Sequence, residues 1–192
     1  MTIVFMVLAV ASLTGWSLHA RLLSRALRSH HRGADTDDRV FFYERDFYCL
    51  SNFSSFCLLW GGRKFATSEA AYHSEKFPDH PEIQSAILLA PSAHEAFRMA
   101  REHERAMRVD WADVRVDVMR RILRAKVEQH PYVLRKLLQT GSREIVEDSW
   151  RDSFWGWGDD RAGANMLGHL WMELREQIRS EAGRLGERAG ES

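Results

Sequence analysis

The chain of 192 residues is long enough for one domain with a sizeable core, and its 45% hydrophobic and 28% charged content is ordinary for a globular protein. Its 27 basic and 27 acidic residues cancel, which argues against nonspecific binding to nucleic-acid backbones. Cys49 and Cys57 are the two cysteines; neither they nor the nine histidines have zinc-site spacing, so we expect reduced thiols in a cytoplasmic protein and no metal.

The N-terminal run, residues 3–18, is almost uncharged and largely apolar, and a cluster of arginines follows it. It is shorter than the roughly 20 residues of a spanning helix, and no basic residue precedes it as in a signal peptide. Three interpretations stay open: a weak anchor holding the domain at the inner face of a membrane, an amphipathic segment that docks on the domain or a partner, and a start codon assigned too far upstream. We therefore divide the chain into an apolar segment with a polar linker (1–39), a folded domain (40–180) and a frayed tail (181–192).

Short strands are predicted at the start of the folded domain. Residues 40–43 are apolar and rich in β-formers. Residues 57–60 and 63–66 flank a Gly-Gly pair, which provides the positive φ angles of a two-residue hairpin turn. The sequence therefore predicts a small antiparallel sheet.

Between these strands, residues 50–54 (LSNFS) form a loop with small polar groups. Turn formation alone explains this composition. Asn52 and Phe53 are nevertheless candidates for contact with a ligand.

A helix is predicted over residues 67–77 (TSEAAYHSEKF). Thr67 or Ser68 suits the N-cap, because its hydroxyl accepts from a free N–H of the first turn. Pro78 stops the helix on the other side.

This helix carries charged side chains on one face. Glu69 lies in the first turn, where the positive end of the helix dipole stabilises a negative charge. Lys76 comes two turns later, roughly 10 Å along the axis, and His73 shares the face. An ordinary surface helix explains this spacing equally well.

Further helices follow. Their start signals are a capping box at Ser92 and Glu95, an N-cap at Asp110 and a first-turn proline at Pro131. Gly141 ends the third of these helices, residues 144–147 fit a short strand, and a last helix is predicted over 165–180. The chain is thus predicted to be α+β, mainly helical with a small antiparallel sheet.

The stretch 152–158 (DSFWGWG) is a poor helix and a poor strand. Its glycines allow a ligand to come close, and Trp faces offer a stacking platform. Backbone N–H groups before the last helix are suited to a phosphate or hydroxyl, although Asn165 is also explained as the cap of that helix. A Trp-rich loop packed on the core accounts for the same pattern without a ligand.

Several motifs together resemble the NADAR (YbiA-like) family in order and spacing, from about Phe42 to Arg179. They are TSEAAYHSEKF, LSNF at 50–53, Asp110-Trp111, LLQTG at 137–141, DSFWGWG and GANMLGHLWMELR at 163–175. The resemblance implies a compact, mainly helical YbiA-like fold and N-glycosidase chemistry on ribosides. Family members cleave ribose 5-phosphate from the base-like amine of early riboflavin intermediates or remove ADP-ribose from modified guanine. A noncatalytic module that binds ADP-ribose or NAD is the remaining alternative.

The resemblance also assigns roles by position. It implies catalytic roles for Glu69, Lys76 and Asp152. With the loop residues above, the expected substrate-binding residues are Tyr43, Asn52, Phe53, His73, Arg101, Lys126, Trp155, Gly156, Trp157 and Asn165. Among these, Arg101 and Lys126 match basic family positions suited to phosphate. The chain departs from the family at His73 and Glu75, where Gln is frequent, and at Ala100, where Gly is usual.

Cleavage of a C–N ribosidic bond develops oxocarbenium character on the sugar. Glu69 is expected to stabilise that charge or activate water, with Asp152 as water base or hydroxyl clamp. The leaving group is expected to take its proton from Lys76, His73 or solvent. Trp155, with Trp157 or Tyr43, is expected to stack on the base. We expect no cofactor. The expected partner is a small ribosyl phosphate or ADP-ribose derivative, with nucleic acid only as an ADP-ribosylated substrate; the sequence does not fix the oligomeric state.

Overall fold

The structure is a computed structural model that describes residues 35–43 and 47–190. The apolar run 3–18 and the three interpretations of it lie outside the described residues. These described residues form one compact unit. In the described part of the chain, no helix has both the length and the apolar character needed to cross a membrane.

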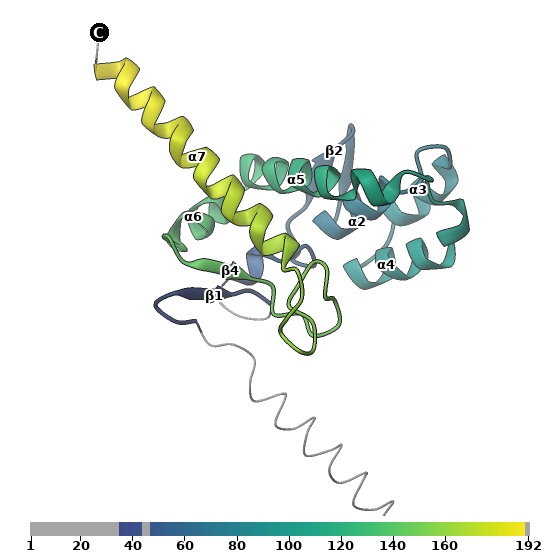
Figure 1. Cartoon of the computed structure of the whole chain (residues 1–192). Coiled ribbons are helices and arrows are strands. Elements are labelled where there is room, and N and C mark those ends of the chain that lie inside the picture. Colours follow the sequence, from purple (N-terminus) through teal and green to yellow (C-terminus); the bar gives the residue numbers. More distant parts are fainter. Residues whose placement is uncertain (1–34, 44–46, 191–192) are drawn as a thin grey trace, which may run out of the picture. The chain divides into compact units, whose positions relative to one another are not determined.

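Helices dominate the described unit (Figure 1). They are α2 (Ser68–Ser74), α3 (Pro81–Leu88), α4 (Ala93–Glu102), α5 (Trp111–Gln129), α6 (Pro131–Gln139) and α7 (Met166–Gly190), with short 3-10 turns η1 (Tyr48–Leu50) and η2 (Glu104–Ala106). The strands are β1 (Arg39–Phe41), β2 (Leu58–Trp60), β3 (Arg63–Phe65) and β4 (Glu144–Val146). The expected fold class, α+β and mainly helical, is confirmed.

The strands form two separate pairs. β2 and β3 are antiparallel, and Gly61 and Gly62 have φ angles of 54° and 73°, as the expected hairpin turn requires. β1 instead pairs with β4 in parallel, with Val40 opposite Ile145. No local sequence pattern predicts the β1–β4 pairing, because it joins segments far apart in the sequence. The pairing also directs the chain after β4 towards the interior.

Helix α2 lies at the centre of the domain rather than on its surface. All of its residues, Ser68–Ser74, are buried, and it contacts α3, α4, α5 and the β2–β3 hairpin. The interpretation as an ordinary surface helix is therefore wrong. Glu69 and His73 owe their burial to the elements around α2, not to their own sequence.

Helix ends follow the sequence signals in part. The Thr67 hydroxyl accepts from the Ala70 N–H at 3.2 Å, and Ser92 likewise caps α4. Asp110 occupies the N-cap position of α5, but its carboxylate binds the Arg108 guanidinium at 2.6 and 2.8 Å instead of the backbone. Helix α2 ends at Ser74, so Lys76 lies just beyond the helix and not in its last turn.

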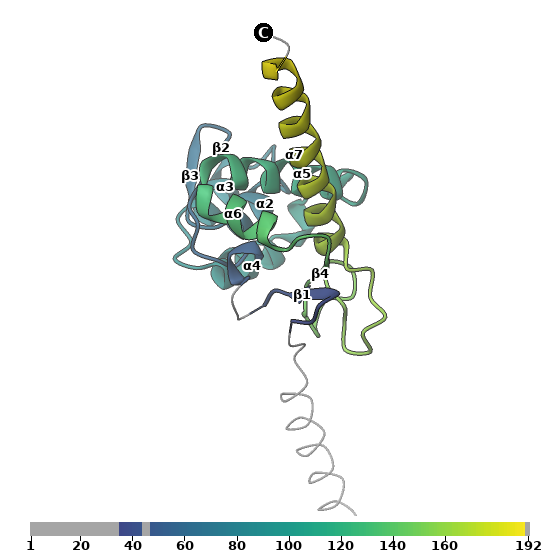
Figure 2. The same ribbon diagram turned by 90° about the vertical axis from the view of Figure 1, so that its left-hand side faces the viewer.

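Helix α7 is longer than predicted and continues to Gly190 (Figures 1 and 2). Its first half is packed into the core through Leu167, Leu170, Trp171 and Leu174. Beyond residue 180, its Glu181 pairs with Arg124 of α5. No helix-breaking proline follows residue 180, and no glycine pair interrupts the segment, which is consistent with its continuation.

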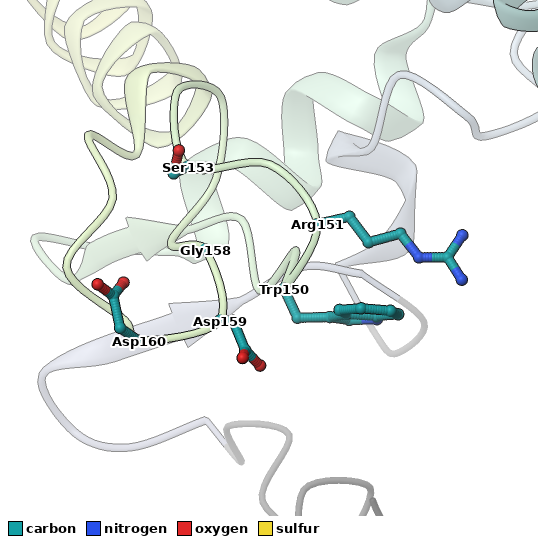
Figure 3. A pocket seen from close by; sticks show the side chains of 6 residues that line it. All are labelled: Trp150, Arg151, Ser153, Gly158, Asp159 and Asp160. Carbon is teal, nitrogen blue, oxygen red and sulfur yellow. The ribbon is translucent and has the colours of Figure 1, made fainter.

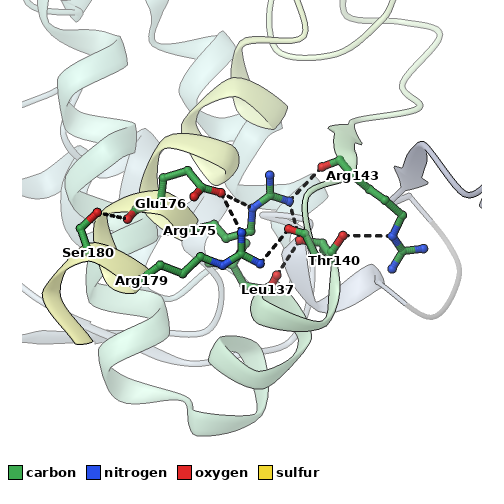
Figure 4. Close-up of polar contacts among 8 residues, drawn as sticks. Leu137, Thr140, Arg143, Arg175, Glu176, Arg179 and Ser180 are labelled. Atoms are coloured by element: carbon green, nitrogen blue, oxygen red, sulfur yellow. Dashed lines mark hydrogen bonds and ion pairs between the residues drawn. The ribbon is translucent and has the colours of Figure 1, made fainter. Parts of the chain in front are cut away.

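Arginines of α7 cap the end of α6 (Figure 4). The Arg175 Nη1 atom donates to the Thr140 hydroxyl at 2.7 Å and to the Arg143 carbonyl at 2.9 Å, and Arg179 donates to the Gly141 carbonyl at 2.9 Å. Cations at a helix C-terminus satisfy carbonyls that have no partner within the helix. These contacts fix the turn between α6 and β4, and so fix where the chain leaves β4.

Candidate active site

Glu69 is held in place at both its backbone and its side chain. Its backbone N–H donates to the Asn52 carbonyl at 3.1 Å, and its Oε1 atom lies 2.8 Å from His73 Nε2. Glu69 is 8% exposed and His73 only 2%. The bond to an ionised Glu69 requires a hydrogen on Nε2, and the buried Nδ1 of His73 has no partner among the described residues.

Aromatic rings form a wall beside this pair. The Tyr72 ring contacts Trp111 at 4.9 Å and meets Trp155 edge-on at 5.6 Å between ring centroids. The Lys76 ammonium lies 5.7 Å from the Tyr72 centroid and 5.5 Å from that of Trp111. Such cation–π contacts hold an ammonium at the edge of an aromatic pocket without neutralising it.

Burial and the charges around the Lys76 ammonium affect its pKa. Burial lowers its pKa from the ordinary value, and the negative charges of Glu69 and Glu104 act in the opposite direction. Burial likewise raises the pKa of the Tyr72 phenol well above its usual range, and the charge of Glu69 adds to this. Glu69, Tyr72 and Lys76 therefore form one electrostatic unit, although Lys76 lies outside the helix.

The loop of residues 152–158, here called the Trp–Gly loop, forms the other side of the site. Asp152 Oδ1 accepts the backbone N–H groups of Phe154 at 2.8 Å and Trp155 at 2.7 Å. This turn presents the Trp155 ring to Tyr72. One oxygen of Asp152 thus shapes the loop.

Two predicted binding positions in this region instead serve the backbone. Asn165 is 3% exposed; its Oδ1 accepts the Glu147 N–H at 3.0 Å and its Nδ2 donates to the Ile145 carbonyl at 2.9 Å. A Cβ added to Gly156 would lie 2.8 Å from the Glu147 carbonyl oxygen and 2.9 Å from Ser149 Cβ. Both residues therefore hold the loop against the end of β4.

Glu147 belongs to this electrostatic unit, and the sequence reasoning missed it. It directly follows β4, and its Oε2 atom is buried with no hydrogen-bond partner among the described residues, although the residue as a whole is partly exposed. Burial, and then the negative charges of Glu69 and Asp152, raise its pKa to about 8. The available signal was an acidic residue directly after the apolar pair of β4, just before the Trp–Gly loop.

Arg115 of α5 was also missed. Its guanidinium lies 3.7 Å from the centroid of the Phe154 ring, and its Nε atom is buried without a hydrogen-bond partner among the described residues. Its positive charge lowers the pKa values of Lys76 and Tyr72, which places it beside them. Its position four residues after Trp111, on the same helix face, was the signal in the sequence.

Of the two predicted phosphate ligands, one is buried beneath a loop and one lies at the rim. Lys126 is fully buried beneath the 51–54 loop, where its Nζ donates to the Ser51 carbonyl at 2.8 Å and the Ser54 hydroxyl at 2.9 Å. Burial lowers the pKa of Lys126 to about 7. Arg101 is exposed at the end of α4, 5.8 Å from the Phe97 ring, which in turn meets His73 edge-on at 5.6 Å. Arg101 thus lies at an outer rim of the site.

The remaining predicted residues are spread around the site. Asn52 donates to Met119 Sδ at 3.2 Å, and its Oδ1 is buried without a partner among the described residues. Phe53 packs on His94. Trp157 packs on Phe41 of β1, with centroids 5.3 Å apart, away from the Tyr72 wall. Tyr43 is partly buried next to residues 44–46, which lie outside the description.

A surface hollow lies on the Trp–Gly loop but does not coincide with this site (Figure 3). Its lining residues are Trp150, Arg151, Ser153, Gly158, Asp159 and Asp160. None of the expected catalytic residues lines it. Within residues 35–43 and 47–190, no three His, Cys, Asp or Glu side chains converge as a metal site would require.

Comparison with known proteins identifies the family of this chain. The chain belongs to the NADAR family, whose domain matches residues 41–179. It is 36% identical to the Escherichia coli protein named N-glycosidase YbiA over 82% of this chain and 98% of that protein. An N-glycosidase of Nostoc punctiforme is 35% identical over 73% of this chain and 93% of that protein. These relatives confirm the expected enzyme class.

Two further comparisons bear on the fold and on the range of relatives. A solution structure of Escherichia coli YbiA superimposes with a TM-score of 0.70 at 35% identity, covering 79% of this chain and 91% of that chain. A riboflavin biosynthesis protein of Vibrio vulnificus is 39% identical over 74% of this chain. The match spans only 39% of that longer protein.

Proposed function

We propose that this protein is an N-glycosidase that hydrolyses the C–N ribosidic bond of ribosyl phosphates such as early riboflavin-pathway intermediates. The observation that carries the proposal is the buried Glu69–His73 pair, which lies beside an aromatic wall and two cations. The names of the relatives, N-glycosidase and riboflavin biosynthesis protein, support the same reaction class.

The role of Glu69 is to meet the positive charge that develops on the sugar. The Glu69 backbone is fixed by its bond to Asn52 and the carboxylate by His73, so the carboxylate does not need to reorganise during the reaction. Beside it, a water molecule can be deprotonated as it adds to C1 of the ribose. Asp152 is the second carboxylate of the site, and its oxygen outside the turn is suited to clamp a ribose hydroxyl.

The cations and the aromatic rings are proposed to bind different parts of the substrate. Arg115 and Lys76 are proposed to bind the 5′-phosphate, because both ammonium and guanidinium groups bind phosphate oxygens well. Trp155, held edge-on by Tyr72, is proposed to stack on the base-like amine. Arg101 at the rim remains a proposed contact for a larger substrate.

A product assay on the full-length protein tests the proposal. The substrates are a ribosylaminopyrimidine 5′-phosphate and ADP-ribosylated DNA, and the measured products are ribose 5-phosphate and ADP-ribose. We expect release of ribose 5-phosphate from the first substrate. Release of ADP-ribose alone would favour the ADP-ribosyl hydrolase, and binding without turnover of either would favour a noncatalytic module.

A further inference from the structure

We infer that Glu147 is the general acid that donates a proton to the leaving nitrogen, and is therefore a catalytic residue of this site together with Glu69. The inference rests on the proposed function, because it assigns a step of that reaction. It selects a donor where the sequence left Lys76, His73 and solvent open.

The backbone of Glu147 is clamped on both sides. Its N–H donates to Asn165 Oδ1 at 3.0 Å, and its carbonyl accepts from the Trp157 N–H at 3.1 Å. Gly156 packs so closely on the same carbonyl that a Cβ there would lie 2.8 Å away. These contacts fix the point from which the side chain extends, as a proton donor requires.

One oxygen of the Glu147 carboxyl group, Oε2, is buried without a hydrogen-bond partner among the described residues. The charges that act on the group are those of Glu69 on α2 and Asp152 on the loop, both negative. Burial, with the added effect of these two negative charges, raises the pKa of Glu147 to about 8, so the carboxyl group holds its proton near neutral pH.

Glu69 has the opposite environment. It lies in the first turn of a helix and meets His73 Nε2 at 2.8 Å. Two carboxyl groups with such different surroundings are suited to the separate roles of base and acid. The competing donors are less available: the Lys76 ammonium lies over two rings, and the His73 Nε2 hydrogen is directed at Glu69.

The step balances with these two groups. The C1–N bond breaks, its electron pair remains on nitrogen, and the nitrogen takes the proton of Glu147. Water adds to C1 and gives its proton to Glu69. Proton exchange with solvent restores both groups, and the products are ribose 5-phosphate and the free amine.

Two substrates separate this role from a structural one. The first is the ribosylaminopyrimidine 5′-phosphate, whose amine must be protonated to leave. The second is 4-nitrophenyl riboside 5-phosphate, whose phenolate leaves without a proton. General acids contribute about 10²–10⁴-fold. Glu147→Gln is expected to lose about that factor in kcat on the amine substrate and less than about tenfold on the nitrophenyl substrate.

Glu144→Gln is the matched control, since Glu144 lies three residues earlier and pairs with Arg39 at the surface. It is expected to behave as wild type on both substrates. An equal loss on both substrates in Glu147→Gln, or no loss on either, would overturn the assignment. Wild-type protein that hydrolyses neither substrate would instead overturn the proposed function, and the role of Glu147 with it.

A second measurement needs no variant. Since the acid must be protonated, wild-type kcat/KM on the amine substrate is expected to fall as the pH rises through about 8. The nitrophenyl substrate is expected to lack this fall. The same alkaline fall with both substrates would contradict the role of Glu147 as proton donor.

Discussion

Replacing Glu147 with Gln is expected to stabilise the fold, and increasingly so as the pH rises from 5 to 7. In the folded protein the pKa of this carboxyl is raised from 4.5 to about 8, mainly by burial. Between these values the unfolded chain has released a proton that the folded protein still holds. Stability therefore falls as the pH rises through this interval, and Gln has no such proton.

The size of the effect follows from the raised pKa. Each pKa unit corresponds to about 1.4 kcal/mol, so the interval from about 4.5 to 7 gives a cost on the order of 3 kcal/mol at pH 7 and under about 1 kcal/mol at pH 5. Lys126 has the opposite sign, because its pKa in the fold is lowered to about 7. Lys126 makes stability depend on pH only above about pH 7, so it does not contribute to the difference between variant and wild type in the window from 5 to 7.

Urea unfolding followed by Trp fluorescence at pH 5 and pH 7 measures the difference. The free energy of unfolding of Glu147→Gln is compared with wild type and with Glu144→Gln at both pH values. The variant's advantage should grow by about 2 kcal/mol or more between them. An advantage that is the same at both pH values would refute the reasoning that this carboxyl is buried and protonated.

Three further predictions concern other residues in and around the site. Arg115→Met should raise KM at least about tenfold for a 5′-phosphorylated riboside but not for its dephosphorylated form. Steady-state assays measure this, and the exposed Arg120→Met is the control. His73→Gln keeps a donor for Glu69 and should keep turnover within about tenfold, whereas His73→Leu should lose about 10²-fold; similar rates for the two would contradict the hydrogen-bond role. Gly156→Ala should destabilise the protein by about 1–3 kcal/mol in urea unfolding, because its Cβ would lie 2.8 Å from a backbone oxygen. Unchanged stability would show that the loop backbone shifts to make room for the Cβ.

Local patterns predicted the elements that local chemistry determines. The hydroxyls of Thr67 and Ser92 cap helices as expected, and the Gly-Gly pair makes the β2–β3 turn. The parallel pairing of β1 with β4 was beyond such patterns, because it depends on how distant segments pack. The burial of α2 has the same origin.

Helical spacing alone could predict the part of the site that one helix carries. Glu69 and His73 are four residues apart on α2 and meet as expected. Glu147 acquires its raised pKa mainly from burial and then from the charge of Glu69, which is far from it in sequence, so no local spacing reveals its buried oxygen. Lys126 shows the converse: its position suited a phosphate, but packing placed it beneath a loop.

The central claim is that Glu69 is the group that drives hydrolysis of the ribosidic bond. Single-turnover release of ribose 5-phosphate from the ribosylaminopyrimidine phosphate should be reduced by at least about 10³-fold in Glu69→Gln. The exposed Glu128→Gln on α5 should match wild type, and circular dichroism should show the same fold in all three proteins. Turnover by Glu69→Gln close to that of wild type would contradict the account.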